Sequence, residues 1–295
     1  MDPVKYVYNR FSRKLHLLRD HRVAAPMSSL TSSAPVRGLK IGIIGFGPFA
    51  QFLTQTMIKQ GHSIRATSRS DYSEHCARLG IPFIRDMDEF LQSDNEVVLL
   101  CTSILSLSDV VKSMPFQCLK RPTLFADVLS VKEYPRDVLL QALPPESDLI
   151  CTHPMFGPES GRDGWHGLTL MYEKVRIRNE AVCSGFLHIF ASELIIAQGC
   201  KMLEMTCEEH DKLAAKSQFL THTIGRVLAE MQIEPTPIDT KGFEKLFEVK
   251  ESVANDSFDL FNGLYVHNRF ARQQLKNFEV AFDGVKHKLL DRMNE

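Results

Sequence analysis

Short apolar runs alternate with helix-like segments from Leu39 to Thr152. Runs of this length between turn residues are typical of buried strands, and their alternation with helices is typical of a parallel, doubly wound sheet with right-handed crossovers. A further pair of strands is expected beyond Thr152. The expected strands are Lys40–Ile44, Ser63–Thr67, Pro82–Arg85, Val97–Thr102, Thr123–Val128, Asp148–Thr152, Leu168–Tyr172 and Lys201–Met205.

Beyond Thr206 the strand signals stop and helical spacing takes over. The sequence Thr206-Cys207-Glu208-Glu209 is a capping box that predicts the start of a long helix. Its apolar stripe contains Leu213, Leu220, Ile224 and Val227. Residues 241–293 are helix-like as well. A helical domain of this length with few aromatic residues often dimerises, so we expect a homodimer.

The first 37 residues differ in composition from the rest of the chain. They are Ser-rich and basic, because only Asp2 and Asp20 oppose Lys5, Arg10, Arg13, Lys14, Arg19, Arg22 and Arg37. Such a segment is either an organellar transit peptide or a flexible arm, and translation could also start at Met27. We predict a flexible leader and a cytoplasmic protein, with a plastid location as the alternative.

The composition favours a globular enzyme with a small-molecule substrate. The net charge of −1 argues against nucleic acid or a membrane surface as partner, and no apolar run is long enough to span a bilayer. Seven cysteines without a Cys-x-x-Cys pair indicate free thiols in a reducing compartment. No metal site is expected.

An apolar strand at Lys40–Ile44 runs into a Gly-x-Gly-x-x-Ala turn and then into helix-like sequence. This order is the dinucleotide-binding fingerprint: the glycines allow a tight turn and close approach to a pyrophosphate, which faces the helix N-terminus. We therefore predict an α/β fold with a Rossmann-type domain at residues 38–205 and an all-helical substrate and dimerisation domain at residues 206–295. The cofactor-binding residues predicted from the turn and from the end of a later strand are Gly45, Gly47, Pro48, Phe49, Ala50 and Thr102.

The end of the second expected strand predicts NADP as the cofactor. NAD-binding domains normally place Asp or Glu about 20 residues past the glycines, where it binds the ribose 2′-hydroxyl. This chain has Ser68, Arg69 and Ser70 there, and no carboxylate precedes Asp71. A guanidinium with flanking hydroxyls suits a 2′-phosphate, although an exposed loop arginine would have the same sequence.

Three motifs extend along the chain: Ser-Val-Lys at Ser130–Lys132, Thr-His-Pro-Met-Phe-Gly-Pro at Thr152–Pro158, and Glu-His-Asp…Ser-Gln-Phe-x-Thr-His-Thr-x-Gly-Arg at Glu209–Arg226. With them, residues 39–289 resemble the TyrA dehydrogenases of tyrosine biosynthesis, most of all the plant arogenate dehydrogenases and the related plant prephenate dehydrogenases. The resemblance implies NADP-dependent oxidative decarboxylation of a cyclohexadienol, with arogenate or prephenate as substrate. A non-catalytic NADP-sensing module is the alternative of a different class.

Such a reaction needs a base for the ring hydroxyl. Imidazole has a suitable pKa, and His153 follows an apolar strand at the edge where ligands of such sheets bind, so we predict His153 as the base. Ser130 is expected to share the hydroxyl or to position the nicotinamide. The alternatives are a structural histidine and a helix-capping serine.

The resemblance also implies the substrate-binding residues. Gln218 and His222 are four residues apart and share a helix face, where amide and imidazole can bind carboxylate oxygens. Ser160, in the segment after His153, and Thr240 are further candidates, and by itself Thr240 has the pattern of a helix N-cap. Asp256 stands where plant arogenate enzymes resemble one another in having Asp, which would attract the arogenate ammonium; a capping or solvated aspartate is the alternative.

The chain departs from the family pattern in two places. No arginine follows Gly242-Phe243, where bacterial relatives clamp the substrate carboxylate, and Lys250 is the nearest substitute. Residues Leu194–Gln198 are an insertion relative to plant sequences of this type, explained either by a longer surface loop or by an error in the gene model.

Overall fold

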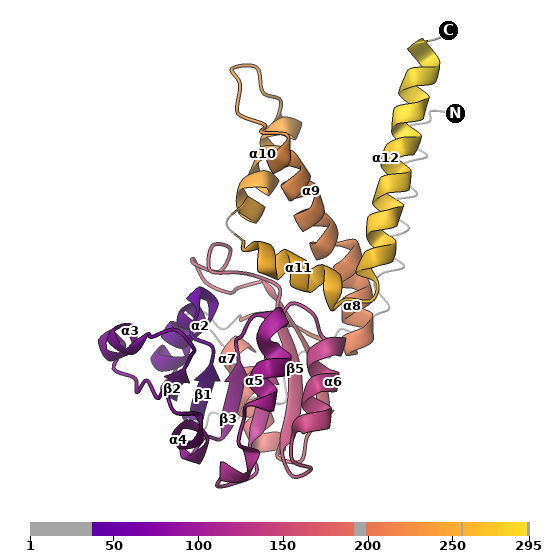
Figure 1. The fold of residues 1–295 in the computed structure, drawn as a ribbon. Coiled ribbons are helices and arrows are strands. Elements are labelled where there is room, and N and C mark those ends of the chain that lie inside the picture. Colours follow the sequence, from indigo (N-terminus) through magenta and orange to yellow (C-terminus); the bar gives the residue numbers. More distant parts are fainter. Residues whose placement is uncertain (1–36, 192–198, 255, 294–295) are drawn as a thin grey trace.

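The computed structural model describes residues 37–191, 199–254 and 256–293. The predicted leader, apart from Arg37, and the Leu194–Gln198 insertion lie outside the described residues. A layered α/β half carries the helical half above one edge of its sheet, and two helical arms extend away from that edge (Figure 1).

Seven strands form one sheet in the order β2-β1-β3-β4-β5-β6-β7. The first five are parallel, as predicted, and their register places the end of β1 beside the ends of β2 and β3. The last pair departs from the prediction of a parallel sheet, since β6 runs antiparallel to β5 while β7 is parallel to β6. The strands are β1 (Lys40–Ile44), β2 (Ser63–Thr67), β3 (Val97–Leu100), β4 (Leu124–Asp127), β5 (Asp148–Pro154), β6 (Thr169–Arg176) and β7 (Lys201–Glu204).

The predicted strand at Pro82–Arg85 was wrong. The segment lies beside β2 at the edge of the sheet, but only one bridge, between Ala66 and Phe83, joins them. Two backbone hydrogen bonds flank that bridge: the Ala66 N–H donates to the Pro82 carbonyl, and the Ile84 N–H donates to the Ala66 carbonyl. Pro82 has no N–H to extend the ladder further.

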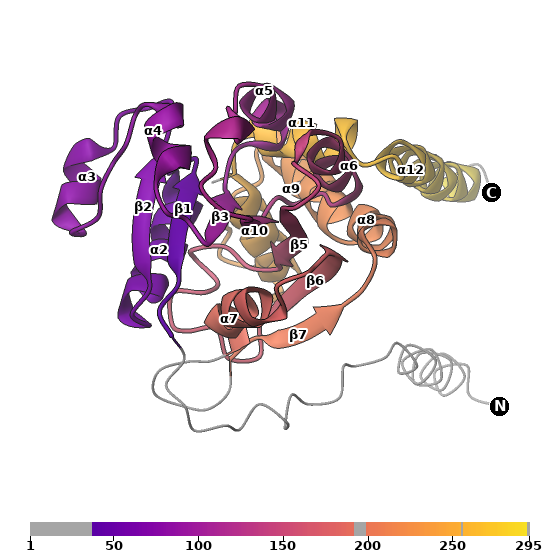
Figure 2. The ribbon, with the colours of Figure 1, turned by 90° about the horizontal axis from the view of Figure 1, so that it is seen from below.

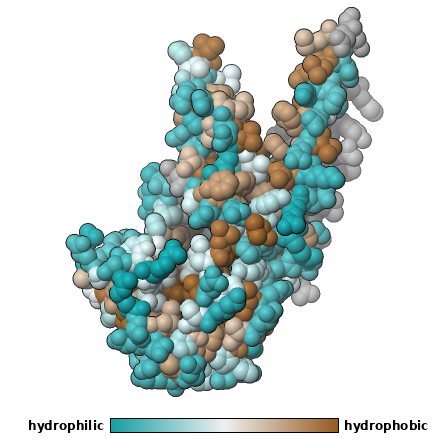
Figure 3. Space-filling model, in the orientation of Figure 1, coloured by the Kyte–Doolittle hydropathy of each residue, from teal (hydrophilic) through white to brown (hydrophobic). Residues whose placement is uncertain are grey.

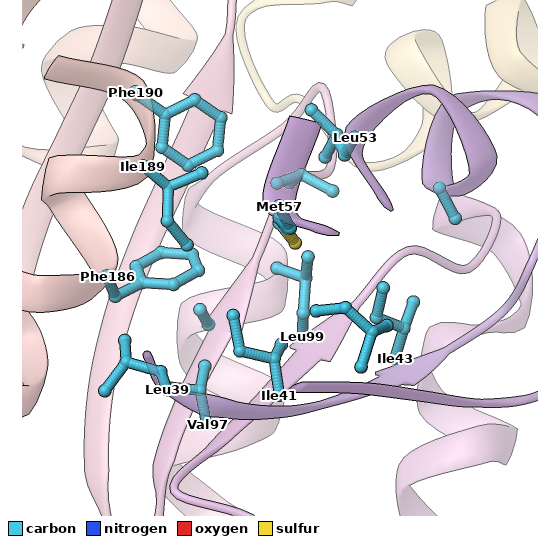
Figure 4. Packing of buried hydrophobic residues seen from close by; sticks show 14 of the residues in the cluster. Leu39, Ile41, Ile43, Leu53, Met57, Val97, Leu99, Phe186, Ile189 and Phe190 are labelled. Atoms are coloured by element: carbon cyan, nitrogen blue, oxygen red, sulfur yellow. The ribbon is translucent and has the colours of Figure 1, made fainter. Parts of the chain in front are cut away.

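Helices cover both faces of the sheet (Figure 2). Alternate strand residues therefore belong to two different apolar clusters. On one face, Ile41, Ile43, Val97 and Leu99 pack against Leu53 and Met57 of α2 and Phe186 and Phe190 of α7 (Figure 4). The α/β half contains the helices α2 (Pro48–Lys59), α3 (Ser73–Arg78), α4 (Met87–Gln92), η2 (Ile104–Ser106), α5 (Leu107–Lys112), η3 (Phe116–Cys118), α6 (Glu133–Ala142) and α7 (Glu180–Ala191).

The cluster on the other face continues into the helical half. Cys207, Phe219 and Leu264 belong to the same cluster as Phe125 and Leu149 of the sheet. A Cβ built on Gly263 would lie 2.9 Å from the Ile104 Cβ, so α11 approaches η2 closely. The parts of the chain before and after the predicted domain boundary at Met205 therefore share the second of the two apolar clusters.

The helical half consists of α8 (Cys207–Lys216), α9 (Gln218–Glu230), α10 (Lys241–Ala254), α11 (Phe258–Val266) and α12 (Ala271–Met293). Thr206 is the N-cap of α8, as the capping box predicts, because its hydroxyl accepts from the Glu209 N–H. The prediction of a single long helix was wrong, since the helix is interrupted at Ser217, between α8 and α9. The predicted apolar stripe does not mark the buried face either: Leu213 and Val227 are exposed. The reason is that α9 packs through Phe219, whose ring stacks on those of Phe261 and Tyr265.

Candidate active site

The loop after β1 has the geometry that its glycines predict. Gly45 has a φ of +86°, and a Cβ there would lie 2.7 Å from the Cys101 carbonyl oxygen, so only glycine fits. Gly47 is the N-cap of α2, with no atom within 4 Å of where its Cβ would be. Pro48 begins the helix, Phe49 packs against Phe52, and Ala50 is buried against the sheet. The turn thus leaves open space in front of a helix N-terminus.

Thr102 follows β3 beside this turn, and its Oγ1 is buried without a hydrogen-bond partner among the described residues. A buried hydroxyl without a partner is uncommon and costs free energy unless a ligand or water satisfies it. With the open N-terminus of α2, this atom fits a dinucleotide bound across the carboxyl ends of β1 and β3.

Two guanidinium groups approach the loop after β2. Ser68 is partly exposed, and Arg69 and Ser70 are exposed. The Arg85 guanidinium donates to the Arg69 carbonyl at 3.4 Å and lies 3.4 Å from Asp71. Asp71 also accepts from the Ser73 N–H, which lowers the pKa of its carboxyl. The carboxylate nearest to this loop is therefore already engaged, and Arg69 and Arg85 provide positive charge.

His153 lies within β5, one residue before the strand ends, and only 4% of its surface is exposed. Its Nδ1 is 2.8 Å from His210 Nε2, and His210 Nδ1 is 2.8 Å from Asp211 Oδ1. This contact leaves Nε2 of His153 as the nitrogen that can face a substrate. Burial lowers the pKa of His153 well below its usual value, and positive charge on His210 or Lys132 lowers it further.

A buried ion pair lies beneath His153. The Lys132 ammonium donates to Asp127 at the end of β4 and to the Thr152 carbonyl, and both charged side chains are fully buried. Burial raises the pKa of Asp127, while Lys132 acts in the opposite direction. Ser130 is partly exposed in the loop between these two residues, and no hydrogen bond joins it to His153 in the described part of the chain.

Polar groups line one face of α9. Gln218, His222 and Arg226 are successive at four-residue spacing, and Gln218 Oε1, His222 Nδ1 and Arg226 Nε are buried without a partner among the described residues. His222 Nε2 is 3.7 Å from Asp256 Oδ2. Burial lowers the pKa of His222; Asp256 raises it and Arg226 lowers it. The structure therefore brings together the predicted residues Gln218, His222 and Asp256.

Asp256 is not a helix cap, because Ser257 caps α11 by accepting from the Leu260 N–H. Arg226 donates to the backbone carbonyls of Asp256 and Ser257, so its charge is not neutralised by the Asp256 carboxylate. The Arg226 guanidinium is thus bound to the backbone at the start of α11, next to the residue that carries the Asp256 carboxylate.

Two predicted substrate-binding residues form local contacts instead. The exposed Ser160 hydroxyl accepts from the Gly157 N–H at 3.0 Å, and Thr240 Oγ1 accepts from the Phe243 N–H at 3.2 Å. Thr240 precedes α10 at the outer end of the α9–α10 hairpin, far from the sheet, and is not brought to Gln218 or His222 within one chain (Figure 1). Lys250 binds the Ile233 carbonyl and Glu234, so it does not replace the missing arginine.

Sequence reasoning gave no role to His210, Asp211, Lys132, Arg226 or Arg85. The first four lie inside the three quoted motifs, which was the available signal. Arg85 had no signal of its own, because its position beside Arg69 arises from the chain crossing the edge of β2.

Other features of the described residues do not add a second candidate site. They contain no group of three or more His, Cys, Asp or Glu that could hold a metal ion. No described helix is long and apolar enough to cross a membrane. A groove of about 580 Å³ between α6 and the start of α12 contains Glu133, Tyr134, His267 and Arg272, but none of the predicted site residues.

Comparison with known proteins gives a consistent result. The family described as "Prephenate dehydrogenase, nucleotide-binding domain" matches residues 51–171, and that described as "TYRAAT1-like, C-terminal domain" matches residues 227–295. Arogenate dehydrogenase 1, chloroplastic, from Arabidopsis thaliana is 54% identical over 260 residues, which cover 87% of this chain and 40% of that protein. Arogenate dehydrogenase 2, chloroplastic, from the same plant is 49% identical over 87% of this chain and 72% of that protein.

Solved structures agree in fold. The Synechocystis arogenate dehydrogenase has a TM-score of 0.59 at 18% identity, over 86% of this chain and 93% of that one. The Aquifex aeolicus prephenate dehydrogenase has a TM-score of 0.63 at 16% identity, with the same coverage. At such identities the likeness concerns the fold, and it extends over both halves of the chain.

Proposed function

Because this chain belongs to the arogenate dehydrogenase family, as its 49% identity over 72% of a family member shows, we propose that it converts arogenate to tyrosine with NADP⁺. The observation that carries the proposal is that the structure has both a buried histidine at the end of β5, in contact with His210 of α8, and a polar face on the following helix α9 where Asp256 adjoins His222. In this reaction the ring hydroxyl loses its proton, the carbon that bears it loses hydride, and the carboxylate leaves as CO₂, so that the ring becomes aromatic.

Bound NADP⁺ supplies the hydride acceptor. The N–H groups at the start of α2 and the space at Gly47 suit the pyrophosphate, and Thr102 Oγ1 is a free hydrogen-bonding group beside it. Arg69 and Arg85 favour the 2′-phosphate of NADP over the bare ribose of NAD.

His153 is the proposed base, acting through Nε2. A positioned base of this kind contributes typically ~10²–10⁴ in rate. Ser130, in the neighbouring loop, is proposed to orient the same hydroxyl. Because His153 is buried, the ring that takes up the proton is shielded from bulk solvent.

The α9 face is the proposed substrate-binding surface. The Nε–H of Arg226 and the side-chain NH2 of Gln218 are donors suited to the two carboxylates, and the Asp256 carboxylate is suited to the side-chain ammonium of arogenate. Prephenate carries a neutral keto group where arogenate carries that ammonium. The Asp256 carboxylate therefore repels the negatively charged prephenate, and no ammonium offsets the repulsion.

The test is a parallel assay of arogenate and prephenate, each with NADP⁺ and NAD⁺, on the purified chain. The proposal expects turnover with arogenate and NADP⁺ to exceed the other three combinations. A preference for prephenate would make the chain a prephenate dehydrogenase. NADPH binding without turnover of either substrate would make it a non-catalytic sensing module.

A homodimer is proposed from the surface of α12. Phe282, Val285, Leu289 and Met293 are exposed at helical spacing along this arm, which extends away from the rest of the molecule (Figure 3). A second copy would cover this stripe. Analytical ultracentrifugation is expected to show a dimer that Val285→Glu converts to monomer; a wild-type monomer at micromolar concentration would contradict the assignment.

A plastid location is proposed in place of the predicted cytoplasmic one. Both Arabidopsis relatives are named as chloroplastic, and residues 1–37 have the basic, Ser-rich composition of a transit peptide. A fluorescent fusion of the full chain in plant cells tests the location, and a cytosolic signal would restore the original prediction.

A further inference from the structure

His210 and Asp211 continue inward from His153 as a buried chain that the reaction, as proposed, leaves without a role. The ring nitrogens of His153 and His210 are 2.8 Å apart, and His210 Nδ1 is 2.8 Å from Asp211 Oδ1. Asp211 is fully buried and His210 nearly so. Both come from the first turns of α8, whereas His153 comes from β5, so the contact joins the two halves of the chain.

Asp211 is held as an acceptor on both oxygens. The Lys132 N–H donates to Oδ1 at 2.8 Å, and the Glu133 N–H donates to Oδ2 at 3.0 Å. The Asn268 amide donates to the Asp211 backbone carbonyl at 2.8 Å, which fixes the residue from a third direction. A carboxylate bound in this way has only acceptor atoms to offer to His210.

This arrangement determines where the protons lie on both rings. His210 must donate from Nδ1 to Asp211, so its neutral ring has a lone pair on Nε2. His153 must then donate from Nδ1 to that lone pair, which leaves its own Nε2 unprotonated. This is the form that a base needs toward a substrate hydroxyl.

We propose that His210 and Asp211 are positioning residues that hold His153 with its Nε2 free to accept the substrate proton and that stabilise the imidazolium formed. The inference rests on the proposed function of His153 as the base. Once His153 takes up the proton, its Nδ1–H becomes a charge-assisted donor to His210, and the negative charge of Asp211 lies directly beyond.

The other charged groups around His153 do not supply this stabilisation. Lys132 repels an imidazolium, and its pairing with Asp127 uses the negative charge on that side. Cys151, two residues before His153, forms a hydrogen bond with Cys207. This bond and burial raise the pKa of the Cys151 thiol. The same bond lowers the pKa of the Cys207 thiol, but burial acts in the opposite direction, and that pKa is raised overall as well. Asp211 is therefore the carboxylate that the structure connects to His153 by hydrogen bonds.

The experiment compares His210→Leu, which removes the acceptor, with His210→Gln, whose Oε1 can take the place of Nε2. His210→Leu is expected to lower kcat by roughly 10²-fold and to move the acid limb of the kcat–pH profile to lower pH, because the imidazolium loses its support. His210→Gln should recover most of the rate. His62→Leu is the matched control, since it removes a buried histidine elsewhere in the protein, one that accepts from the Leu39 N–H in the α/β half, and it should leave the acid limb in place.

Nitrogen-15 NMR of histidine-labelled wild-type protein tests the inference in the unaltered site. It should find His153 protonated at Nδ1 and not at Nε2, with assignment by His153→Asn. The opposite tautomer would overturn the proposal, and so would an unmoved acid limb in His210→Leu or equal losses in the two His210 variants. If His153→Asn itself turns over normally, the proposed base is wrong, and that outcome is distinct from failure of the His210 variants alone.

Discussion

The two polar clusters of the site differ in how completely the protein satisfies them. Hydrogen bonds close the chain from His153 through His210 to Asp211 and on to the N-terminus of α6. On α9, by contrast, Gln218, His222 and Arg226 each keep a buried polar atom without a partner among the described residues. The first cluster is organised without a ligand, and the second has polar atoms left to bind one.

The difference matches the two tasks that we propose for these clusters. A base gains from donors and charges that need no rearrangement during the reaction. A binding face gains affinity from groups that are unsatisfied beforehand, each at a cost of about 1–3 kcal/mol to the free protein. Variants in the first cluster should thus affect folding and rate, and variants in the second should affect substrate choice.

Breaking the buried ion pair between Lys132 and Asp127, which lies next to the first cluster, should have the largest effect. Lys132→Met leaves Asp127 charged and fully buried without its partner, which should lower the free energy of unfolding by about 3–5 kcal/mol in urea denaturation. Lys174→Met is the control, because Lys174 pairs with Glu180 at the surface and should cost less than about 1 kcal/mol. Similar losses for the two variants would mean that burial of the pair has no consequence.

Next in size is cofactor choice. Arg69→Asp replaces a positive charge suited to a 2′-phosphate by a negative one that repels it. The ratio of kcat/KM for NADP⁺ to kcat/KM for NAD⁺ should fall by a factor that corresponds to about 1.5–3 kcal/mol of transition-state binding. Arg78→Asp on α3 makes the same change of charge at an exposed position away from the loop after β2. A wild type that uses NAD⁺ as well as NADP⁺ would rule out the interpretation of that loop.

Substrate choice should change at Asp256. Asp256→Asn removes attraction to the arogenate ammonium and repulsion of prephenate, so kcat/KM should fall roughly tenfold to a hundredfold for arogenate and rise for prephenate. Asp259→Asn, in the first turn of α11 and exposed, should change neither. If both activities fall together in Asp256→Asn, the residue supports structure and does not select substrate.

The smallest expected effect is on how the free energy of unfolding depends on pH. Burial lowers the pKa of both His153 and His222, so below the ordinary value of 6.5 the unfolded chain takes up protons that the folded chain does not. Stability present at pH 7 should then be lost as pH falls toward 5, by at most about 1.4 kcal/mol per pH unit for each histidine. Asp256 partly offsets the shift at His222, so His153→Asn should flatten the pH dependence of urea denaturation more than His222→Asn does. The reverse order would contradict the contrast in their surroundings.

Much of the fold was predictable because buried parallel strands are continuous apolar runs. The dinucleotide turn was predictable because its glycines meet a steric requirement, which Gly45 satisfies beside the Cys101 carbonyl. The direction of β6 was not, since an apolar run is the same in either direction. The strand predicted at Pro82–Arg85 was wrong because a strand needs backbone pairing along its length, and this segment pairs with β2 through one bridge only.

The site was predictable where position along the chain decides it. His153 was predicted from its place at the end of a strand, whereas Gln218 and His222 were predicted from the family resemblance, and helical spacing gave only the face that they share. The link from His153 to His210 spans 57 residues and depends on how α8 packs against the sheet, which no local pattern encodes. Thr240 shows the converse, because its local capping pattern was the correct interpretation within one chain.

The contact between β5 and α8 also bears on how modular this chain is. A recombinant joined after Met205 would look like an exchange of whole domains, yet it would separate His153 from the histidine and aspartate that adjoin it. The helical half of another protein would bring its own neighbours for the base together with its own α9 face. Substrate preference and the pKa of the proposed base would therefore change together in such a recombinant. A segment that preserves both has to begin in β5 and not at the domain boundary.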